Sequence, residues 1–177
     1  MRTKLALVLI LLLVPLAGCV TGAARYRLVE PVASDRPVFE DKSLRITVGL
    51  KDYSKFELEV RNKTGAPLRI TWGNSRIVTP SGEEKIMYKA GGRGVADRNE
   101  ITTIKPGGLA VCEAYPAAHA YNDSRGREQV YPLYYKGSEE ASPDALDDRP
   151  VGIILLMEVN EHARRLPIML KVEPPVL

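Results

Sequence analysis

The side chains best suited to metal binding or nucleophilic catalysis are two cysteines, Cys19 and Cys112, and two histidines, His119 and His162. A structural zinc site needs closely spaced Cys and His ligands. These four residues are scattered along the chain, so the sequence predicts no metal site and no cofactor. Cys112 alternates with alanines in a short apolar run, which favours a buried and unreactive thiol.

Hydrolytic chemistry would need a nucleophile held beside a base. His119 and Asp123 could supply two members of a catalytic set. This hydrolase alternative expects a serine or a carboxylate within hydrogen-bond reach of His119. However, the sequence contains no Gly-x-Ser-x-Gly segment, and no serine stands out by its surroundings. We therefore predict that the protein is not an enzyme.

Two other segments have the composition of ligand loops but not their spacing. Gly91-Gly92-Arg93-Gly94 lacks the strand-then-helix setting of a dinucleotide site and the Gly-Lys-Ser/Thr of a Walker loop. We interpret residues 89–99 as a flexible hairpin loop. The acidic residues between 139 and 148 lack the alternating spacing of a calcium loop, so a solvated loop is favoured there.

Tyrosines form the most suggestive cluster, because five of the eight fall between residues 115 and 135. Tyrosine combines a large apolar ring with a polar tip and is enriched at binding surfaces. The region is therefore a candidate binding surface. The alternative is that these rings cover one end of the folded domain. The five residues are Tyr115, Tyr121, Tyr131, Tyr134 and Tyr135.

The amino-terminal residues have the three parts of a secretory signal. Arg2 and Lys4 are basic, residues 5–16 are almost wholly apolar, and two small residues precede Cys19. The apolar run is shorter than the ~20 residues that span a bilayer. The segment Leu16-Ala17-Gly18-Cys19 resembles the lipobox of bacterial lipoproteins.

This resemblance implies cleavage after residue 18 and a diacylglycerol on the sulfur of Cys19. Two or more acyl chains, at ~0.8 kcal/mol per buried methylene, hold a protein stably at a membrane. Val20, where an Asp would suggest inner-membrane retention, favours an outer-membrane lipoprotein that faces the periplasm. In a host with one membrane, the domain would lie on the outer cell surface. A Cys19–Cys112 disulfide is the alternative if no lipid is attached.

The expected mature chain is long enough for one domain with a sizeable core. Loss of residues 1–18 removes two basic residues and leaves 23 basic against 22 acidic ones, a net charge of +1. Nucleic-acid binding is not expected, because it needs a concentrated basic surface. Residues 19–42 are interpreted as a lipidated tether with a mean reach of ~25 Å. An edge strand over 25–29 is the alternative, and the folded domain is placed at 43–177.

Period-two alternation of apolar and polar residues recurs along the folded part and indicates strands. Almost no helical period is present. Eight or nine short strands predict an all-β fold: an immunoglobulin-like sandwich of about seven to nine strands, with a small β-barrel as the alternative. The expected strands cover residues 44–50, 56–60, 68–72, 77–78, 85–88, 101–104, 109–115, 151–160 and 166–172, with weaker signals for a strand at 130–136 and a helical turn at 142–144.

A spaced set of turn and core residues adds a second resemblance. The set comprises Asn62-Lys63-Thr64, Pro67-Leu68, Ile70, Trp72, Gly82, Ile104, Pro106-Gly107 and Tyr115-Pro116. Over roughly residues 43–116, it resembles uncharacterised bacterial envelope lipoproteins with one immunoglobulin-like domain. The resemblance implies a fold but supplies no catalytic residue.

Taken together, these patterns predict a lipid-anchored envelope protein that acts as a non-catalytic protein-binding or assembly module. Its expected partners are the membrane, through Cys19, and another envelope protein, met by the tyrosine-rich region or at a strand edge. A periplasmic carrier of a small ligand or glycan is the alternative, and it expects a concave apolar pocket near Tyr131 and Tyr134.

Overall fold

The computed structural model describes residues 25–133 and 150–173, and antiparallel strands dominate this part of the chain. The all-β prediction is confirmed, although the described residues form twelve strands where seven to nine were expected. Two short 3-10 helices, η1 (Trp72–Asn74) and η2 (Ala117–His119), lie between strands. The strands are β1 (Arg25–Glu30), β2 (Val38–Glu40), β3 (Leu44–Lys51), β4 (Lys55–Asn62), β5 (Leu68–Thr71), β6 (Arg76–Thr79), β7 (Gly82–Arg98), β8 (Ile101–Pro116), β9 (Ala120–Asn122), β10 (Glu128–Val130), β11 (Val151–Val159) and β12 (His162–Glu173).

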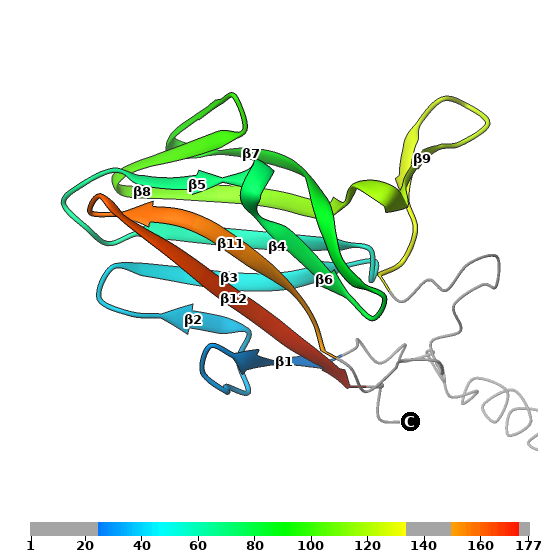
Figure 1. Cartoon of the computed structure of the whole chain (residues 1–177), viewed down its shortest axis with the longest axis horizontal. Coiled ribbons are helices and arrows are strands. Elements are labelled where there is room, and N and C mark those ends of the chain that lie inside the picture. Colours follow the sequence, from blue (N-terminus) through cyan, green and yellow to red (C-terminus); the bar gives the residue numbers. More distant parts are fainter. Residues whose placement is uncertain (1–24, 134–149, 174–177) are drawn as a thin grey trace, which may run out of the picture.

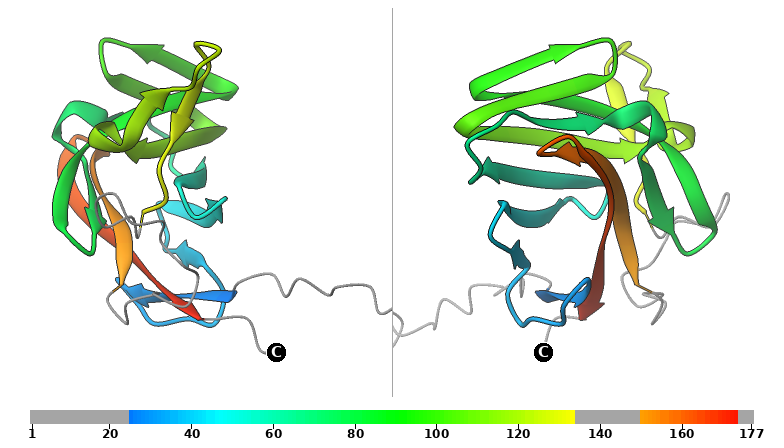
Figure 2. Two further views of the ribbon diagram at one scale, coloured as in Figure 1. Left: turned by 90° about the vertical axis from the view of Figure 1, so that its right-hand side faces the viewer. Right: turned by 60° about the vertical axis from the view of Figure 1, so that its left-hand side comes forward.

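Ten of the described strands form one continuous sheet, in the order β1-β12-β11-β6-β7-β8-β4-β3-β2, with β5 paired to both β11 and β8. The sheet folds over so that β11 and β12 cross in front of β3 and β4 (Figure 1). The left view of Figure 2 shows these pairs on opposite sides of the molecule, as in a sandwich. At one end β11, β5, β8, β7 and β6 also pair into a closed ring, a barrel-like feature.

Apolar side chains between the two layers form the core. Alternate residues of β3 and β4 face inward, as the period-two pattern predicts. Strands β11 and β12 supply the opposing side. Side chains of this core that are no more than 1% exposed include Leu44, Ile46, Val48, Phe56, Leu58, Val60, Ile153, Leu155, Met157, Ile168 and Leu170.

The expected tether is partly wrong, because the sheet begins well before residue 43. Strand β1 pairs with β12, which confirms the edge-strand alternative for residues 25–29. Strand β2 pairs with β3. Leu28 is 1% exposed and Phe39 is 7% exposed, so both belong to the core. Burial of these two side chains, rather than local strand pattern, fixes the segment.

The expected flexible loop over 89–99 is also wrong, because residues 89–98 belong to β7. Its hairpin with β8 is long, and the pairing shifts register between Arg93 and Val95. Gly92 has a φ of +133°, and an added Cβ there would lie 2.2 Å from the Leu109 carbonyl oxygen. The glycines therefore permit close strand approach and a bulge, which the sequence pattern does not distinguish from a loop.

Most of the remaining predicted strands are present in the structure. The strands predicted within 77–88 and within 151–172 are confirmed, and they pair as the hairpins β6–β7 and β11–β12. The strands expected at 101–104 and 109–115 are one strand, β8, which continues through Gly107 at a φ of +68°. Only Glu128–Val130 forms a strand near the one expected at 130–136. Residues 134–149, including the helical turn expected at 142–144, lie outside the described part.

Trp72 fills the place where the strands of the ring diverge. Strands β5 and β6 both pair with β11, and η1 separates them. The Trp72 ring is 1% exposed and stacks on Tyr88 of β7, with ring centroids 4.7 Å apart and planes 13° apart. Its Nε1 donates a hydrogen bond to Thr102 Oγ1 of β8 at 2.7 Å. One side chain thus connects three elements of the ring.

A short polar chain extends from this indole. Thr102 Oγ1 donates to Asp97 Oδ1 at 2.9 Å, and the Tyr88 hydroxyl donates to the same oxygen at 3.1 Å. Burial, followed by the nearby Asp97 carboxylate, raises the pKa of Tyr88 to about 12. The Tyr88 hydroxyl therefore stays protonated at neutral pH and remains a donor.

Thr102→Val keeps the shape of this buried side chain but removes its hydroxyl. It leaves the indole N–H of Trp72 without its acceptor, so we expect a loss of ~1–3 kcal/mol in the free energy of unfolding. Urea unfolding measures the loss. Thr103→Val is the matched control, because its half-buried hydroxyl has no hydrogen-bond partner among the described residues. Equal losses in the two variants would contradict the assigned role of Thr102.

Asp41 connects the two layers at one edge. Its Oδ1 accepts hydrogen bonds from the Ser43 and Leu44 amides at 2.7 and 2.9 Å, and Arg164 of β12 donates to its Oδ2 at 2.5 Å. The Arg164 guanidinium also lies over the Phe39 ring, 5.4 Å from its centroid. Burial raises the pKa of Asp41, but the hydrogen bonds from Arg164 and the amides together lower it below its ordinary value.

A carboxylate whose pKa is lowered in the fold stabilises that fold above its unfolded pKa, and the contribution is lost as pH falls through the folded pKa. We expect Asp41→Asn to reduce the free energy of unfolding at neutral pH. The difference from the parent should shrink below about pH 4, the ordinary range of an aspartate. Urea unfolding over a pH series measures it, with exposed Asp35→Asn as control. A difference that is constant down to pH ~2 would contradict this role.

Candidate functional site

A separate two-stranded hairpin projects from the main sheet just after β8. Strands β9 and β10 pair with each other, through Tyr121 opposite Gln129 and Ala120 opposite Val130. Helix η2 leads into the hairpin from the end of β8. Figure 1 shows β9 standing away from the body of the molecule, and the right view of Figure 2 shows the same hairpin in yellow. The tyrosine-rich region therefore contains a protruding element.

Two tyrosines stack on this hairpin. The rings of Tyr121 and Tyr131 have centroids 4.2 Å apart and planes 20° apart. Tyr131 lies two residues beyond Gln129, the direct partner of Tyr121, and such diagonal neighbours are within reach of aromatic side chains. The two residues are 40% and 37% exposed. The structure thus brings together two of the five predicted binding tyrosines at the surface.

The turn of the hairpin is braced by Asp123. Its Oδ1 accepts hydrogen bonds from the amides of Arg125 and Arg127, at 2.8 and 2.9 Å. Its Oδ2 lies 2.8 Å from Arg127 Nε and 2.7 Å from Arg127 Nη2. The Arg127 amide and then its guanidinium lower the pKa of Asp123. Gly126, at a φ of +73°, completes the turn. Asp123 therefore acts as a turn cap and does not face His119.

Tyr115 occupies a different position from the one predicted. It is 1% exposed, so its ring is not part of an accessible tyrosine surface. Its hydroxyl donates to Glu128 Oε1 of β10 at 2.7 Å, and Lys55 Nζ lies 5.1 Å from its ring centroid. Burial, then the hydrogen bond to Glu128, raises the pKa of Tyr115 to about 12. Tyr115 thus fastens the turn end of β10 to β8.

Glu128 is the other half of this attachment. It accepts from Tyr115 and also lies 3.4 Å from Lys89 Nζ of β7. The hydrogen bond from Tyr115, then the one from Lys89, lowers the pKa of Glu128. The carboxylate is therefore ionised at neutral pH, and the hairpin is held by a charge-assisted hydrogen bond.

His119 holds the base of the hairpin. Its Nε2 lies 3.5 Å from Glu84 Oε1 of β7, and its Nδ1 lies 3.4 Å from the Tyr131 carbonyl oxygen. The Tyr131 amide in turn donates to the His119 carbonyl at 3.0 Å. Further along, the Leu133 amide donates to the Tyr53 carbonyl at 2.8 Å, and the Leu133 side chain is buried. The stacked tyrosines are therefore anchored on both sides.

The surroundings of His119 also bear on the hydrolase alternative. Glu84 is a carboxylate at the edge of hydrogen-bond reach, as that alternative expects. However, the hydroxyls of Thr79 and Ser81 contact Glu84 Oε1, at 3.0 and 3.5 Å, rather than the imidazole. Both ring nitrogens face acceptors. Among the described residues, this arrangement braces the hairpin and presents no nucleophile to the histidine.

Several other predicted residues can now be placed. Cys112 is buried in the core, as predicted, and burial raises the pKa of its thiol to about 12. His162 is exposed at the start of β12. Cys19, Tyr134, Tyr135 and the acidic residues 139–148 lie outside the described part. Over residues 25–133 and 150–173, no three His, Cys, Asp or Glu side chains gather closely enough to hold a metal ion.

Comparison with protein-family models, curated proteins and solved structures gave no match. Within the described ranges, no helix is both long and apolar enough to cross a membrane. The resemblance to envelope lipoproteins therefore remains an expectation, and the geometry of this chain carries the functional argument.

Sequence reasoning missed the residues that brace the tyrosine pair. Glu84 and Glu128 are common charged residues in strands and carry no local signal of a tertiary contact. Asp123 followed by Gly126 is a turn signature that could have located the hairpin. The stack itself follows from the register of β9 and β10, which the sequence does not show.

Tyr115→Phe removes only the hydroxyl that binds Glu128. We expect faster amide hydrogen exchange in β9 and β10, by up to about tenfold, because a part-buried charge-assisted hydrogen bond between β8 and β10 is lost. Exchange monitored by NMR or mass spectrometry measures this change. Tyr53→Phe is the control, because the Tyr53 ring is 37% exposed and its hydroxyl makes no hydrogen bond in the described part. Unchanged exchange in both variants would contradict the anchoring role of Tyr115.

Proposed function

We propose that this protein is a lipid-anchored cell-envelope protein and a non-catalytic protein-binding module, with the Tyr121–Tyr131 pair as its contact surface. The observation that carries the proposal is the exposed ring stack on a projecting hairpin that is braced at its turn, at Glu128 beside the turn and at its base. The partner is another envelope protein. Its contact site would be an apolar hollow that accepts aromatic side chains and offers polar groups to the phenol hydroxyls.

Preorganisation supports this proposal. Binding normally costs free energy for ordering the side chains and loops of the interface, at ~0.5–1.5 kcal/mol for each immobilised side chain. The stack already restricts both rings, and Asp123 and Glu128 restrict the hairpin backbone. A partner would therefore meet an ordered aromatic surface, and less of the interaction free energy would be lost on binding.

Strand-edge pairing is a weaker route to a partner. The edge strands of the main sheet are β1 and β2. Strand β2 has only three residues, and the pairing of β1 is irregular between Leu28 and Glu30. Short and irregular edge strands disfavour addition of another strand. The tyrosine hairpin is therefore the better-supported contact.

The carrier alternative has less support. It expects a concave apolar pocket near Tyr131 and Tyr134. Tyr134 lies outside the described part, and Tyr131 is stacked and exposed on a projecting hairpin. A projecting surface suits a protein partner better than it suits enclosure of a small ligand.

The anchor is proposed from the resemblance at Cys19. Strand β1 begins at Arg25, six residues after Cys19. Six residues span at most ~20 Å when fully extended. If Cys19 carries lipid, the domain would be held closer to the membrane than a tether ending near residue 42 would hold it. The partner is therefore expected to be a membrane-bound protein or one that lies at the membrane surface.

The proposal is tested by cross-linking the protein in intact cells and identifying the captured proteins by mass spectrometry. We expect one dominant envelope partner that Tyr121→Ala/Tyr131→Ala fails to capture. The purified partner should bind the parent, and the double variant should bind it at least tenfold more weakly, as hot-spot aromatics do. Tyr53→Ala is the matched control, because it removes a tyrosine that is 37% exposed elsewhere.

Cys19→Ser separates the anchor from the contact surface. We expect this variant to leave the membrane fraction while its purified domain keeps its affinity for the partner. Membrane association that is unchanged in Cys19→Ser would overturn the anchor. Equal partner binding by the parent and the double tyrosine variant would overturn the contact surface.

A further inference from the structure

The outer face of the sheet is hollowed near the tip of the β7–β8 hairpin, on a different surface from the tyrosine pair. Here β5, β8 and β7 lie side by side, with Arg69 opposite Thr103 and Thr103 opposite Ala96. The hollow has a volume of about 310 Å³, which is near the lower bound for small-molecule sites. Its lining residues are Arg69, Ala96, Arg98, Asn99, Ile101 and Thr103.

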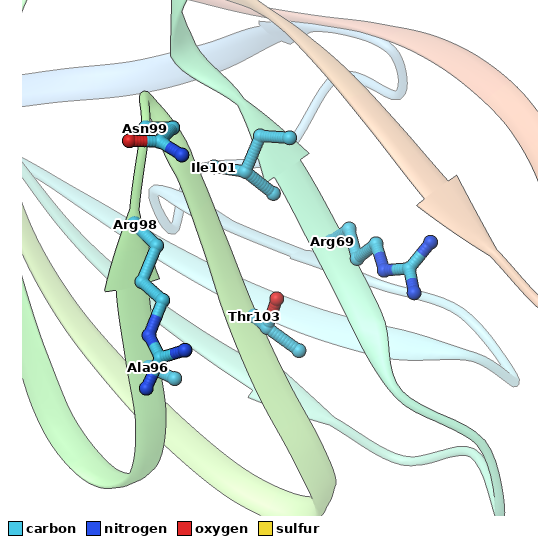
Figure 3. A pocket seen from close by; sticks show the side chains of 6 residues that line it. All are labelled: Arg69, Ala96, Arg98, Asn99, Ile101 and Thr103. Carbon is cyan, nitrogen blue, oxygen red and sulfur yellow. The ribbon is translucent and has the colours of Figure 1, made fainter.

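The hollow follows from side-chain size. Thr103 lies in the middle of the cross-strand row and Ala96 at one end of it, and both are small, whereas Arg69 and Arg98 have long side chains. Figure 3 shows Arg98 running along β7 past Ala96, Arg69 extending away on the other side, and Thr103 between the two. Ile101 lies in the neighbouring row and is 38% exposed.

The charges at this hollow are only partly compensated. Arg69 Nη1 lies 3.4 Å from Glu158 Oε1 of β11, a single contact in which both side chains are about half exposed. Arg98 is exposed and has no ion pair or hydrogen bond from its side chain within residues 25–133 and 150–173. The lining residues together with Glu158 carry two guanidinium groups and one carboxylate, a net charge of +1 that suits a ligand with one negative charge.

The wall of the hollow at the hairpin tip is fixed. The Trp72 amide donates to the Glu100 carbonyl at 2.9 Å, which ties the tip to η1. Asn99 and Glu100 have φ values of +47° and +62°, a two-residue turn for which Asn is well suited. Thr102 is fixed from inside by the Trp72 indole. The backbone around the hollow is therefore fixed before a ligand binds.

We infer that this hollow binds a small organic monoanion that carries a carboxylate beside an apolar group. The planar guanidinium of Arg98 matches a carboxylate, and the Thr103 hydroxyl and the Asn99 amide offer further donors. Exposed Ile101 would cover the apolar group. The Glu158 carboxylate disfavours ligands with two or more negative charges. This inference is independent of the tyrosine hairpin and of the lipid anchor.

The test uses N-acetyl-leucine as probe and the full chain in detergent, observed by NMR. We expect shifts of the amide signals of Arg98, Ile101 and Thr103, with a Kd on the order of 1 mM for a ligand of this size. N-acetyl-leucinamide lacks the charge and N-acetylglycine lacks the apolar group, so both should bind at least several-fold more weakly. A hexapeptide ending in leucine distinguishes the source of the carboxylate. Tighter binding by the peptide indicates a peptide carboxyl end, and equal binding indicates a free acid.

Arg98→Gln should weaken binding of N-acetyl-leucine by about tenfold, because one charge-assisted contact is lost. Arg93→Gln is the matched control, because Arg93 is an exposed arginine on the same strand without a described partner and lies outside the hollow. No shifts up to 20-fold above the expected Kd would overturn the inference, as would equal binding of N-acetyl-leucinamide or equal weakening by the two substitutions.

Discussion

The architecture depends on how the gap between β5 and β6 is filled. Both strands pair with β11, and η1 separates them. The sheet turns from one layer to the other at this point. Trp72 occupies this gap with its ring against Tyr88 and its N–H on Thr102. A smaller side chain would leave a cavity. An apolar side chain of equal size would leave Thr102 Oγ1 without the hydrogen bond that it accepts from the indole. The ring of five strands therefore requires both the volume and the polar group of tryptophan.

The long β7–β8 hairpin, which Trp72 contacts through Tyr88 and Thr102, borders both candidate sites. Its tip, fixed to η1 through Glu100, forms one wall of the arginine hollow. Its other end leads into the β9–β10 hairpin. Glu84 of β7 contacts His119, and Lys89 of β7 contacts Glu128 of that hairpin. Close approach of the two strands is possible because position 92 is a glycine. Residues 89–98, which have the composition of a loop, therefore belong to the strand that supports both candidate sites.

Strands with a local signal were predictable from sequence, whereas strands defined by distant partners were not. Strands β3 and β4 alternate cleanly, because one face of each packs on the core and the other faces solvent. Strand β1 has the same geometry, but it is placed by β12, nearly 150 positions away in the sequence, and its own pattern is short. The glycines at positions 91, 92 and 94 misled for a different reason: they permit either a loop or a bulged strand, and only the partner strand decides which.

The tyrosine cluster shows the same limit at a functional site. Composition alone located the region, but it could not separate a tyrosine that fastens the hairpin from those that the hairpin displays. Tyr115 lies on the outer face of β8 beside the exposed Met87, yet β10 covers it through Glu128. Tyr121 and Tyr131 are 40% and 37% exposed, and their rings stack at the end of the β9–β10 strand pair. The two roles are therefore linked, because the buried hydroxyl of Tyr115 holds the hairpin on which Tyr121 and Tyr131 are exposed.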